Sequence, residues 1–226
     1  MKIAIFYHIA QMGMSAFIYQ QQLHRLYTSG LIEAADYIHF GVNGDQELFN
    51  VPDKVIVHHN QKEYWGTEKE TLLSLKDFCK ENPEYKVLYF HTKGASKDTL
   101  GVQSWRLMME YFVIDKWKEC VKELDEYTCV GAHLGTVGPS LYPDGSLIEN
   151  DPIHTYMGNF WWANASYINT IKERYIQSNC RMEKERWIGD SDSCYPKTLY
   201  VNRLFEENPP GFNNYDYYFT EKDYIK

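Results

Sequence analysis

A run of eleven residues, KVLYFHTKGAS at 86–96, constrains the fold of this chain more than any other stretch. Residues 86–90 are long, β-branched or aromatic and contain no turn former, which is typical of a strand buried on both faces of a parallel sheet. The run then turns polar and cationic at His91, Thr92, Lys93 and Gly94. In open α/β sheets, ligands lie just beyond the carboxyl ends of the strands. The run therefore predicts a central strand whose end suits an anionic ligand; the alternative is an ordinary strand-to-loop exit with a solvated lysine.

Strands and helices are predicted to alternate along the first half of the chain. The patterns predict strands at 2–9, 37–42 and 54–59 and helices at 15–29 and 68–80, the last with a capping box from Thr67 to Glu70. Such alternation is typical of a parallel sheet with helices on both faces.

The second half is predicted to add antiparallel pairing. The patterns predict a long helix at 103–126, a strand at 127–134, a proline-rich loop at 138–155, a strand running into a helix at 157–168, and an aromatic tail at 208–226 that packs on the domain. We therefore expect an α/β fold with a mixed, mainly parallel central sheet flanked by helices, in one domain spanning 1–226.

Composition excludes several classes of protein. The net charge is −8 and the basic residues are dispersed, which argues against a nucleic-acid groove. Aromatic residues make up 16% of the chain and suit either a core or a surface for sugars or bases. The five cysteines form no CxxC pair. The N-terminal apolar run is short for a signal peptide. No apolar stretch approaches the ~20 residues that span a bilayer. We expect a cytoplasmic protein with reduced thiols and no transmembrane segment.

Common nucleotide and hydrolase motifs are missing from the sequence. It contains no GxxxxGK[ST], GxGxxG or GxSxG pattern. Histidines occur at several predicted strand ends, yet no HxH or HExxH spacing indicates a zinc site. Any phosphate-binding site must therefore be built in another way.

Three segments resemble one known family. YFHTKG at 89–94, MGNFWWA at 157–163 and ERWIG at 185–189 are similar to GT-A nucleotide-sugar glycosyltransferases, especially small bacterial polysaccharide enzymes and large-DNA-virus enzymes that glycosylate their capsid. The likeness covers nearly the whole chain. It implies a GT-A-like, Rossmann-related fold with a nucleotide-sugar-binding half at about 1–100 and an acceptor half at about 101–226. It also implies sugar transfer from a nucleoside diphosphate sugar, UDP-sugars first, to a glycan or glycoprotein hydroxyl, in the cytoplasm of a bacterium or a virus-infected cell.

The sequence departs from this family at the expected metal site. Such enzymes usually end the central strand in Asp-x-Asp, which holds Mn²⁺ or Mg²⁺ on the sugar diphosphate, whereas this chain has His91-Thr92-Lys93. The Lys93 ammonium can supply one fixed positive charge in place of the metal, and preorganised groups of this kind contribute roughly 3–4 kcal/mol each. Asp190 and Asp192 form another Asp-x-Asp but follow no predicted strand. They are weak metal candidates, with a solvated loop or a helix cap as the alternative.

The resemblance also implies which residues contact the donor. The ends of the first and third strands are expected near the nucleotide, with the diphosphate at 91–94. The candidates for the base and ribose are Tyr7, His8, Ile9, His59 and Asn60, although packing alone also explains Ile9.

The acceptor is expected at the segment 157–163. Gly158 would let the backbone approach a sugar closely, and Asn159 is a further acceptor candidate in the same segment. Trp161 and Trp162 are adjacent on a strand and point to opposite faces, so that one is core and the other is a candidate platform for a sugar. His154, upstream, is a candidate contact for the diphosphate or the acceptor.

Inverting sugar transfer needs a carboxylate that takes the proton of the acceptor hydroxyl. Glu185 is the first candidate for this base and Asp190 the second. The alternative for each is a surface helix of mixed charge, and a retaining enzyme needs no such base. Two other functions stay open: a catalytically inactive carbohydrate-binding domain of the same fold, and a glycoside hydrolase with two carboxylates, for which strand ends rich in His and Lys are poor material.

Overall fold

The computed structural model describes residues 1–60, 68–97, 99–137, 153–178, 181–201 and 218–225. Its centre is a seven-stranded sheet in the order β3-β2-β1-β4-β8-β5-β9. The strands are β1 (Lys2–Ala10), β2 (Tyr37–Asn43), β3 (Val55–His59), β4 (Tyr85–His91), β5 (Cys129–Gly131), β8 (Trp161–Asn164) and β9 (Pro196–Thr198).

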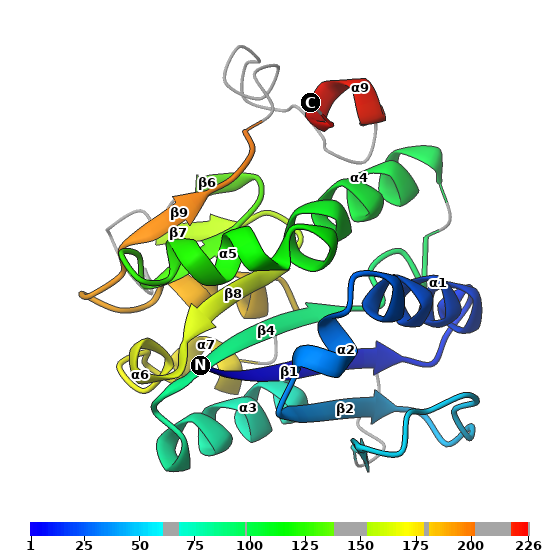
Figure 1. Cartoon of the computed structure of the whole chain (residues 1–226), viewed down its shortest axis with the longest axis horizontal. Helices are drawn as coiled ribbons and strands as arrows, with labels where there is room; N and C mark the ends of the chain where they lie inside the picture. The colour runs from blue at the N-terminus through cyan, green and yellow to red at the C-terminus, as the bar shows by residue number, and fades with distance from the viewer. Residues whose placement is uncertain (61–67, 98, 138–152, 179–180, 202–217, 226) are drawn as a thin grey trace, which may run out of the picture.

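The sheet is mixed and mainly parallel, as the sequence predicts (Figure 1). Strands β1 to β4 run parallel, β8 lies antiparallel between β4 and β5, and β5 pairs in parallel with β9. The strand at 86–91 is central, with three strands on either side. The α/β fold class is confirmed.

Helices cover both faces of the sheet because side chains alternate along each strand. Leu88 and Phe90 of β4 enter one core, whereas Val87 and Tyr89 enter the other. The first core lies under α1 (Ser15–Thr28), α2 (Leu31–Ala34), α4 (Leu100–Glu110) and α5 (Trp117–Glu123), and the second under α3 (Lys69–Glu81), α6 (Ala165–Ile168), α7 (Arg174–Gln177) and the 3₁₀ helix at Arg181–Gly189.

The helix predicted at 103–126 is interrupted. A π-helical turn at Tyr111–Asp115 separates α4 from α5, and the Lys116 N–H donates to the Tyr111 carbonyl, five residues back. Inside this turn the carbonyl of Val113 accepts a hydrogen bond from Trp162 Nε1 at 2.7 Å. The buried indole of Trp162, on a distant strand, thus donates to a carbonyl that would accept a backbone N–H in a regular helix. The pattern of residues in the helix does not reveal this contact.

Two predicted segments differ from the structure. Residues 153–155, the end of the loop expected at 138–155, belong to β7 (Ile153–Tyr156), which pairs antiparallel with β6 (Leu134–Val137) in a separate two-stranded sheet. The strand predicted at 127–134 is split between β5 and the start of β6. The rest of the expected loop, 138–152, lies outside the described residues, as does the expected cap Thr67.

Of the aromatic tail expected at 208–226, residues 208–217 and 226 lie outside the described residues, and residues 218–225 pack on the α4 side. Phe219 and Tyr224 are buried in the same core as α1 and α4, and α9 (Glu221–Tyr224) begins at a capping box between Thr220 and Asp223. Among the described residues, no helix is long and apolar enough to cross a membrane.

Candidate functional site

The strand order identifies where a ligand site is expected. From β1 the sheet grows outward through β2 and β3, and β4 then lies on the opposite side of β1 (Figure 1). The carboxyl ends of β1 and β4 therefore form the topological switch point, where open α/β sheets bind their ligands. Thr92 joins these two ends, because its N–H donates to the His8 carbonyl and its Oγ1 accepts from the Ala10 N–H, both at 3.0 Å.

His91 connects the end of β4 to the turn that precedes β8. Its Nε2 lies 2.9 Å from the carbonyl oxygen of Gly158. A carbonyl only accepts, so Nε2 carries the hydrogen. Nδ1 then faces a carboxylate oxygen of Glu68 at 3.9 Å. The imidazole is buried and fixed in orientation by groups from two other elements.

Glu68 is a site residue that the sequence analysis missed. Its buried carboxylate accepts hydrogen bonds from Tyr89 Oη at 2.7 Å and from Asn159 Nδ2 at 2.5 Å. Trp161 Nε1 in turn donates to Asn159 Oδ1 at 2.8 Å. Burial, followed by the charge of Glu68, raises the pKa of Tyr89 well above its ordinary value, so the phenol stays a donor. An acidic residue at a helix start gives no local signal of burial; only the packing of α3 against β4 creates it.

Lys93 is buried rather than solvated. Its side chain is 7% exposed, and Nζ lies 4.0 Å from the centre of the Trp105 ring on α4. A cation over an indole face is attracted by the ring quadrupole. The ammonium therefore lies on the α4 side of the strand end, whereas His91 faces Glu68 beside α3.

Glycine is favoured at two positions here, because each has a positive φ and leaves no room for a Cβ atom. Gly94 has φ +91°, and a Cβ there would lie 2.9 Å from Val102 Cγ1. Gly158 has φ +97°, and a Cβ there would lie 2.6 Å from Met109 Sδ and 3.2 Å from Lys93 Cε. The side chains of Met109 and Lys93 thus lie close to the Gly158 backbone, where the sequence analysis expected a sugar.

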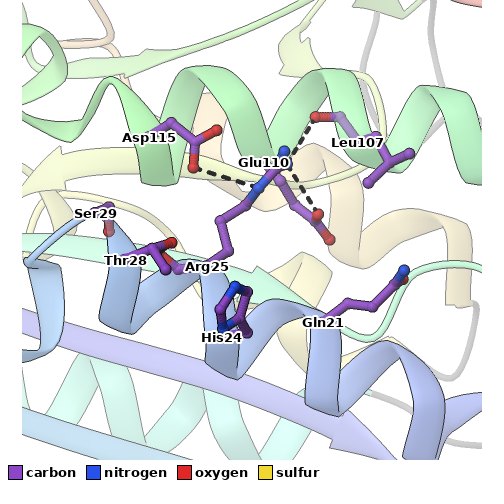
Figure 2. Close-up of a pocket in the computed structure, with 8 residues that line it drawn as sticks. All are labelled: Gln21, His24, Arg25, Thr28, Ser29, Leu107, Glu110 and Asp115. Carbon is purple, nitrogen blue, oxygen red and sulfur yellow. Dashed lines mark hydrogen bonds and ion pairs between the residues drawn. The ribbon is translucent and has the colours of Figure 1, made fainter.

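A polar network holds the strand end from the α1 side. Gln22 Nε2 donates to the His91 carbonyl at 3.1 Å and to Glu110 Oε1 at 2.7 Å. Glu110 also accepts from Arg106 NH1 at 2.9 Å and Arg25 NH1 at 3.2 Å. Figure 2 shows Arg25 reaching from α1 between Glu110 and Asp115, in a surface pocket of about 520 Å³.

The structure brings some donor candidates together and separates others. His8 Nδ1 lies 2.9 Å from Thr71 Oγ1, and Asn60 Nδ2 lies 3.4 Å from the same hydroxyl, so α3 joins the ends of β1 and β3. Tyr7 and Ile9 instead point into the α1-side core, where Tyr7 donates to Gln22 Oε1 at 2.6 Å. His59 is exposed, with Nδ1 3.1 Å from the Gly44 carbonyl.

The acceptor candidates are mostly internal. Trp161 and Trp162 point to opposite faces, as expected, but both are fully buried, one in each core. Neither indole therefore presents a ring on which a sugar could stack. Gly158 and Asn159 lie beside the strand end, and His154 is exposed on β7.

The two candidate bases have different surroundings. Glu185 is half-buried on the 3₁₀ helix, where its backbone carbonyl accepts a hydrogen bond from Thr155 Oγ1 of β7. Asp190 is buried in a bidentate ion pair with Arg174, whose Nε lies 2.9 Å from Oδ2. Its carboxylate is therefore engaged in holding α7.

The metal candidates gain no support from the geometry. Asp192 is exposed, and in the described part of the chain no three His, Cys, Asp or Glu side chains gather as a metal site.

Comparison with known proteins gives a family and weak structural likenesses. Residues 10–187 match the family model described as "Domain of unknown function (DUF8361)". No curated protein matches the sequence. Among solved structures, a 4-diphosphocytidyl-2C-methyl-D-erythritol synthase is 10% identical, with 89% of each chain covered and a TM-score of 0.43.

Two further structures are similarly distant. The bifunctional IspDF from Campylobacter jejuni is 9% identical, with 99% of this chain and 53% of that chain covered and a TM-score of 0.41. The 2-C-methyl-D-erythritol 4-phosphate cytidylyltransferase of Francisella tularensis is 9% identical, with 96% of each chain covered and a TM-score of 0.42. At this level of similarity these structures carry no argument about the activity of this chain.

Proposed function

The chain belongs to the family described as "Domain of unknown function (DUF8361)", and we propose that it is a GT-A-type glycosyltransferase. It would move a sugar from a nucleoside diphosphate sugar, with UDP-sugars as the first candidates, to a hydroxyl group of a glycan or glycoprotein.

One observation carries this proposal: the cationic end of the central strand lies at the switch point of the sheet. Lys93 follows β4 directly and is buried. Its ammonium lies over the Trp105 ring, and phosphate oxygens form charge-assisted hydrogen bonds with a lysine ammonium. A fixed cation at this position is suited to hold the donor's phosphates.

The same group suits the chemistry of transfer. As the acceptor oxygen attacks the anomeric carbon, the bond to the diphosphate breaks and negative charge grows on the leaving phosphate. A preorganised ammonium stabilises this charge as it develops. If the configuration inverts, Glu185 is our candidate to take the proton of the acceptor hydroxyl.

The strand end does not fit a divalent cation. His91, Thr92 and Lys93 supply no carboxylate, and an ammonium would repel the ion. We therefore propose that donor binding does not require a metal ion.

Calorimetric titration with UDP, UDP-sugars and GDP-sugars, with and without Mn²⁺, tests the proposal. We expect wild-type protein to bind one of these donors without Mn²⁺. Lys93→Ala should weaken binding or transfer by about 100-fold or more, because it removes the charge that faces the phosphates. Lys97→Ala is the matched control, since Lys97 is an exposed lysine on the same loop, and should leave affinity unchanged.

Two results would contradict the proposal. One is no nucleotide binding by wild-type protein under any of these conditions. The other is sugar binding without nucleotide binding, unaltered by Lys93→Ala, which would instead favour the inactive carbohydrate-binding domain.

A further inference from the structure

Two cysteines lie side by side at the edge of the sheet opposite β3. Cys129 begins β5, and Cys194 lies two residues before β9. The segments are held together next to the thiols, because the Thr128 N–H donates to the Tyr195 carbonyl at 2.9 Å and the Tyr195 N–H donates to Thr128 Oγ1 at 2.8 Å. The register of β5 and β9 pairs Cys129 with Pro196, two residues beyond Cys194, and Cys194 packs against the core that contains Cys129.

The two thiols have unequal surroundings. Cys129 is 1% exposed and lies 3.7 Å from Tyr156 Oη, whereas Cys194 is only half-buried. Hydrogen bonds from Cys129 and Tyr167 lower the pKa of Cys194 to about 7. The hydrogen bond to Cys194 and burial raise the pKa of Cys129 well above its ordinary value. The Cys194 sulfur is thus accessible and nucleophilic, whereas the Cys129 sulfur is buried and stays protonated.

The other described cysteines provide a contrast. Cys79 and Cys120 are fully buried, and burial raises the pKa of each thiol. Buried thiols in apolar surroundings are inert toward oxidants and alkylating agents.

We propose that Cys194 is a peroxide-reactive thiol and that Cys129 is its resolving partner, so that oxidation closes a disulfide between β5 and the segment before β9. The Cys194 thiol gives up its proton, and its thiolate attacks one oxygen of a hydroperoxide. The O–O bond breaks to give a sulfenic acid, and the leaving oxygen takes up that proton to become water or an alcohol. The sulfur of Cys129 then attacks the sulfenic sulfur, and the departing hydroxyl leaves with the Cys129 proton as water. Overall, two thiols are oxidised to a disulfide and one hydroperoxide is reduced.

Peptide mass mapping of the full chain tests this proposal without any substitution. Reduced, desalted protein is treated with hydrogen peroxide, its remaining thiols are alkylated, and it is digested without reduction. The expected product is an intrachain Cys129–Cys194 peptide pair that has lost two hydrogens and is restored by dithiothreitol. With limiting N-ethylmaleimide in place of peroxide, Cys194 should react at least about tenfold faster than Cys79 and Cys120.

Substitutions distinguish the two roles. In Cys129→Ser, peroxide should leave Cys194 as a sulfenic acid that dimedone traps, whereas in Cys194→Ser, Cys129 should stay reduced. Cys79→Ser is the matched control and should form the disulfide as wild type does. The proposal is overturned if wild-type Cys194 reacts no faster than the buried cysteines, or if peroxide joins it to Cys180 or to a second chain instead of Cys129.

Discussion

At the scale of single residues, the site depends on polar groups that are buried and mutually satisfied. Glu68 shows the principle, since its carboxylate would be costly to bury without the hydroxyl of Tyr89 and the amide of Asn159. The three side chains come from the N-cap position of α3, from β4 and from the turn before β8. The hydrogen bonds among these three side chains therefore also fix the positions of the elements that carry them.

Gly158→Ala should destabilise the protein more than an ordinary glycine at positive φ does. Gly30 is the matched control, because its φ is +73° and nothing lies within 4 Å of a Cβ there. Gly30→Ala should cost about 1 kcal/mol for the left-handed backbone alone. Gly158→Ala should cost about 2–4 kcal/mol, because the new methyl group also meets Met109. Urea unfolding measures both, and equal losses would show that no clash occurs at Gly158.

His39 should make the fold sensitive to acid. Its ring stacks on Phe6 with centroids 5.2 Å apart, and burial, followed by the charge of His58, lowers its pKa from 6.5 to about 4. The unfolded chain therefore binds a proton more readily than the folded one between these values, and stability falls as pH falls from about 6.5 to about 4.

Unfolding free energies measured across this pH range test the sign. His39→Phe keeps a ring on Phe6 but cannot be protonated, so its stability should fall less steeply with acid than that of the wild type. Identical pH profiles for the two proteins would rule out His39 as a source of acid sensitivity.

At the scale of elements, α1 and α4 are joined by charge as well as by apolar contact. Glu110, 1% exposed, lies between Arg25 and Arg106 and reaches the strand end through Gln22. Figure 2 shows its contact with Arg25. It is the last residue of α4 before the π-helical turn. This network joins the two helices, and its member Gln22 on α1 donates a hydrogen bond to the His91 carbonyl.

Glu110→Ala should destabilise the protein by about 3–5 kcal/mol, because it leaves two guanidinium groups without their shared carboxylate. Chemical denaturation monitored by tryptophan fluorescence measures the loss. The control is Glu84→Ala, which removes an exposed ion pair with Lys2 and should leave the unfolding midpoint unchanged. A loss at Glu110 no larger than at Glu84 would contradict a structural role for the network.

At the scale of the whole molecule, the far end of the chain completes a core that the beginning of the chain starts. Phe219 lies edge-on to His133, and its N–H donates to Ser104 Oγ at 3.0 Å. Tyr224 contacts the rings of Tyr111 and Phe112. The first core thus draws on residues from β1 to α9.

Phe219→Ala should release the terminal segment from α4. Phe219 is 3% exposed and its neighbour Tyr218 is 56% exposed, so Tyr218→Ala is the matched control. Amide hydrogen exchange at 218–225 should be at least about tenfold faster in Phe219→Ala, because the buried ring is lost, and unchanged in Tyr218→Ala. Equal exchange in the two variants would show that the ring does not hold the segment.

Local patterns predicted the long elements well and the short ones poorly. The strands at 2–9, 37–42 and 54–59 and the helices at 15–29 and 68–80 match the structure within two residues, because their apolar periodicity lies inside each segment. β7 and β9 have four and three residues, too few to show a period. They exist because neighbouring strands supply their hydrogen bonds.

By itself, the sequence determined that strands and helices alternate and that one central strand with the apolar run 87–90 ends in His91, Thr92 and Lys93, because these properties depend on consecutive residues. Only the tertiary structure decided which groups meet that end. Glu68 arrives at the N-cap position of α3, and Asn159 arrives on the turn before an antiparallel strand nearly seventy residues further along the chain from His91. Trp161 and Trp162 are both buried because β8 lies between β4 and β5, with a core on each face of the sheet. Contacts between segments far apart in the chain depend on which elements pack together, and no local pattern of residue types encodes that choice.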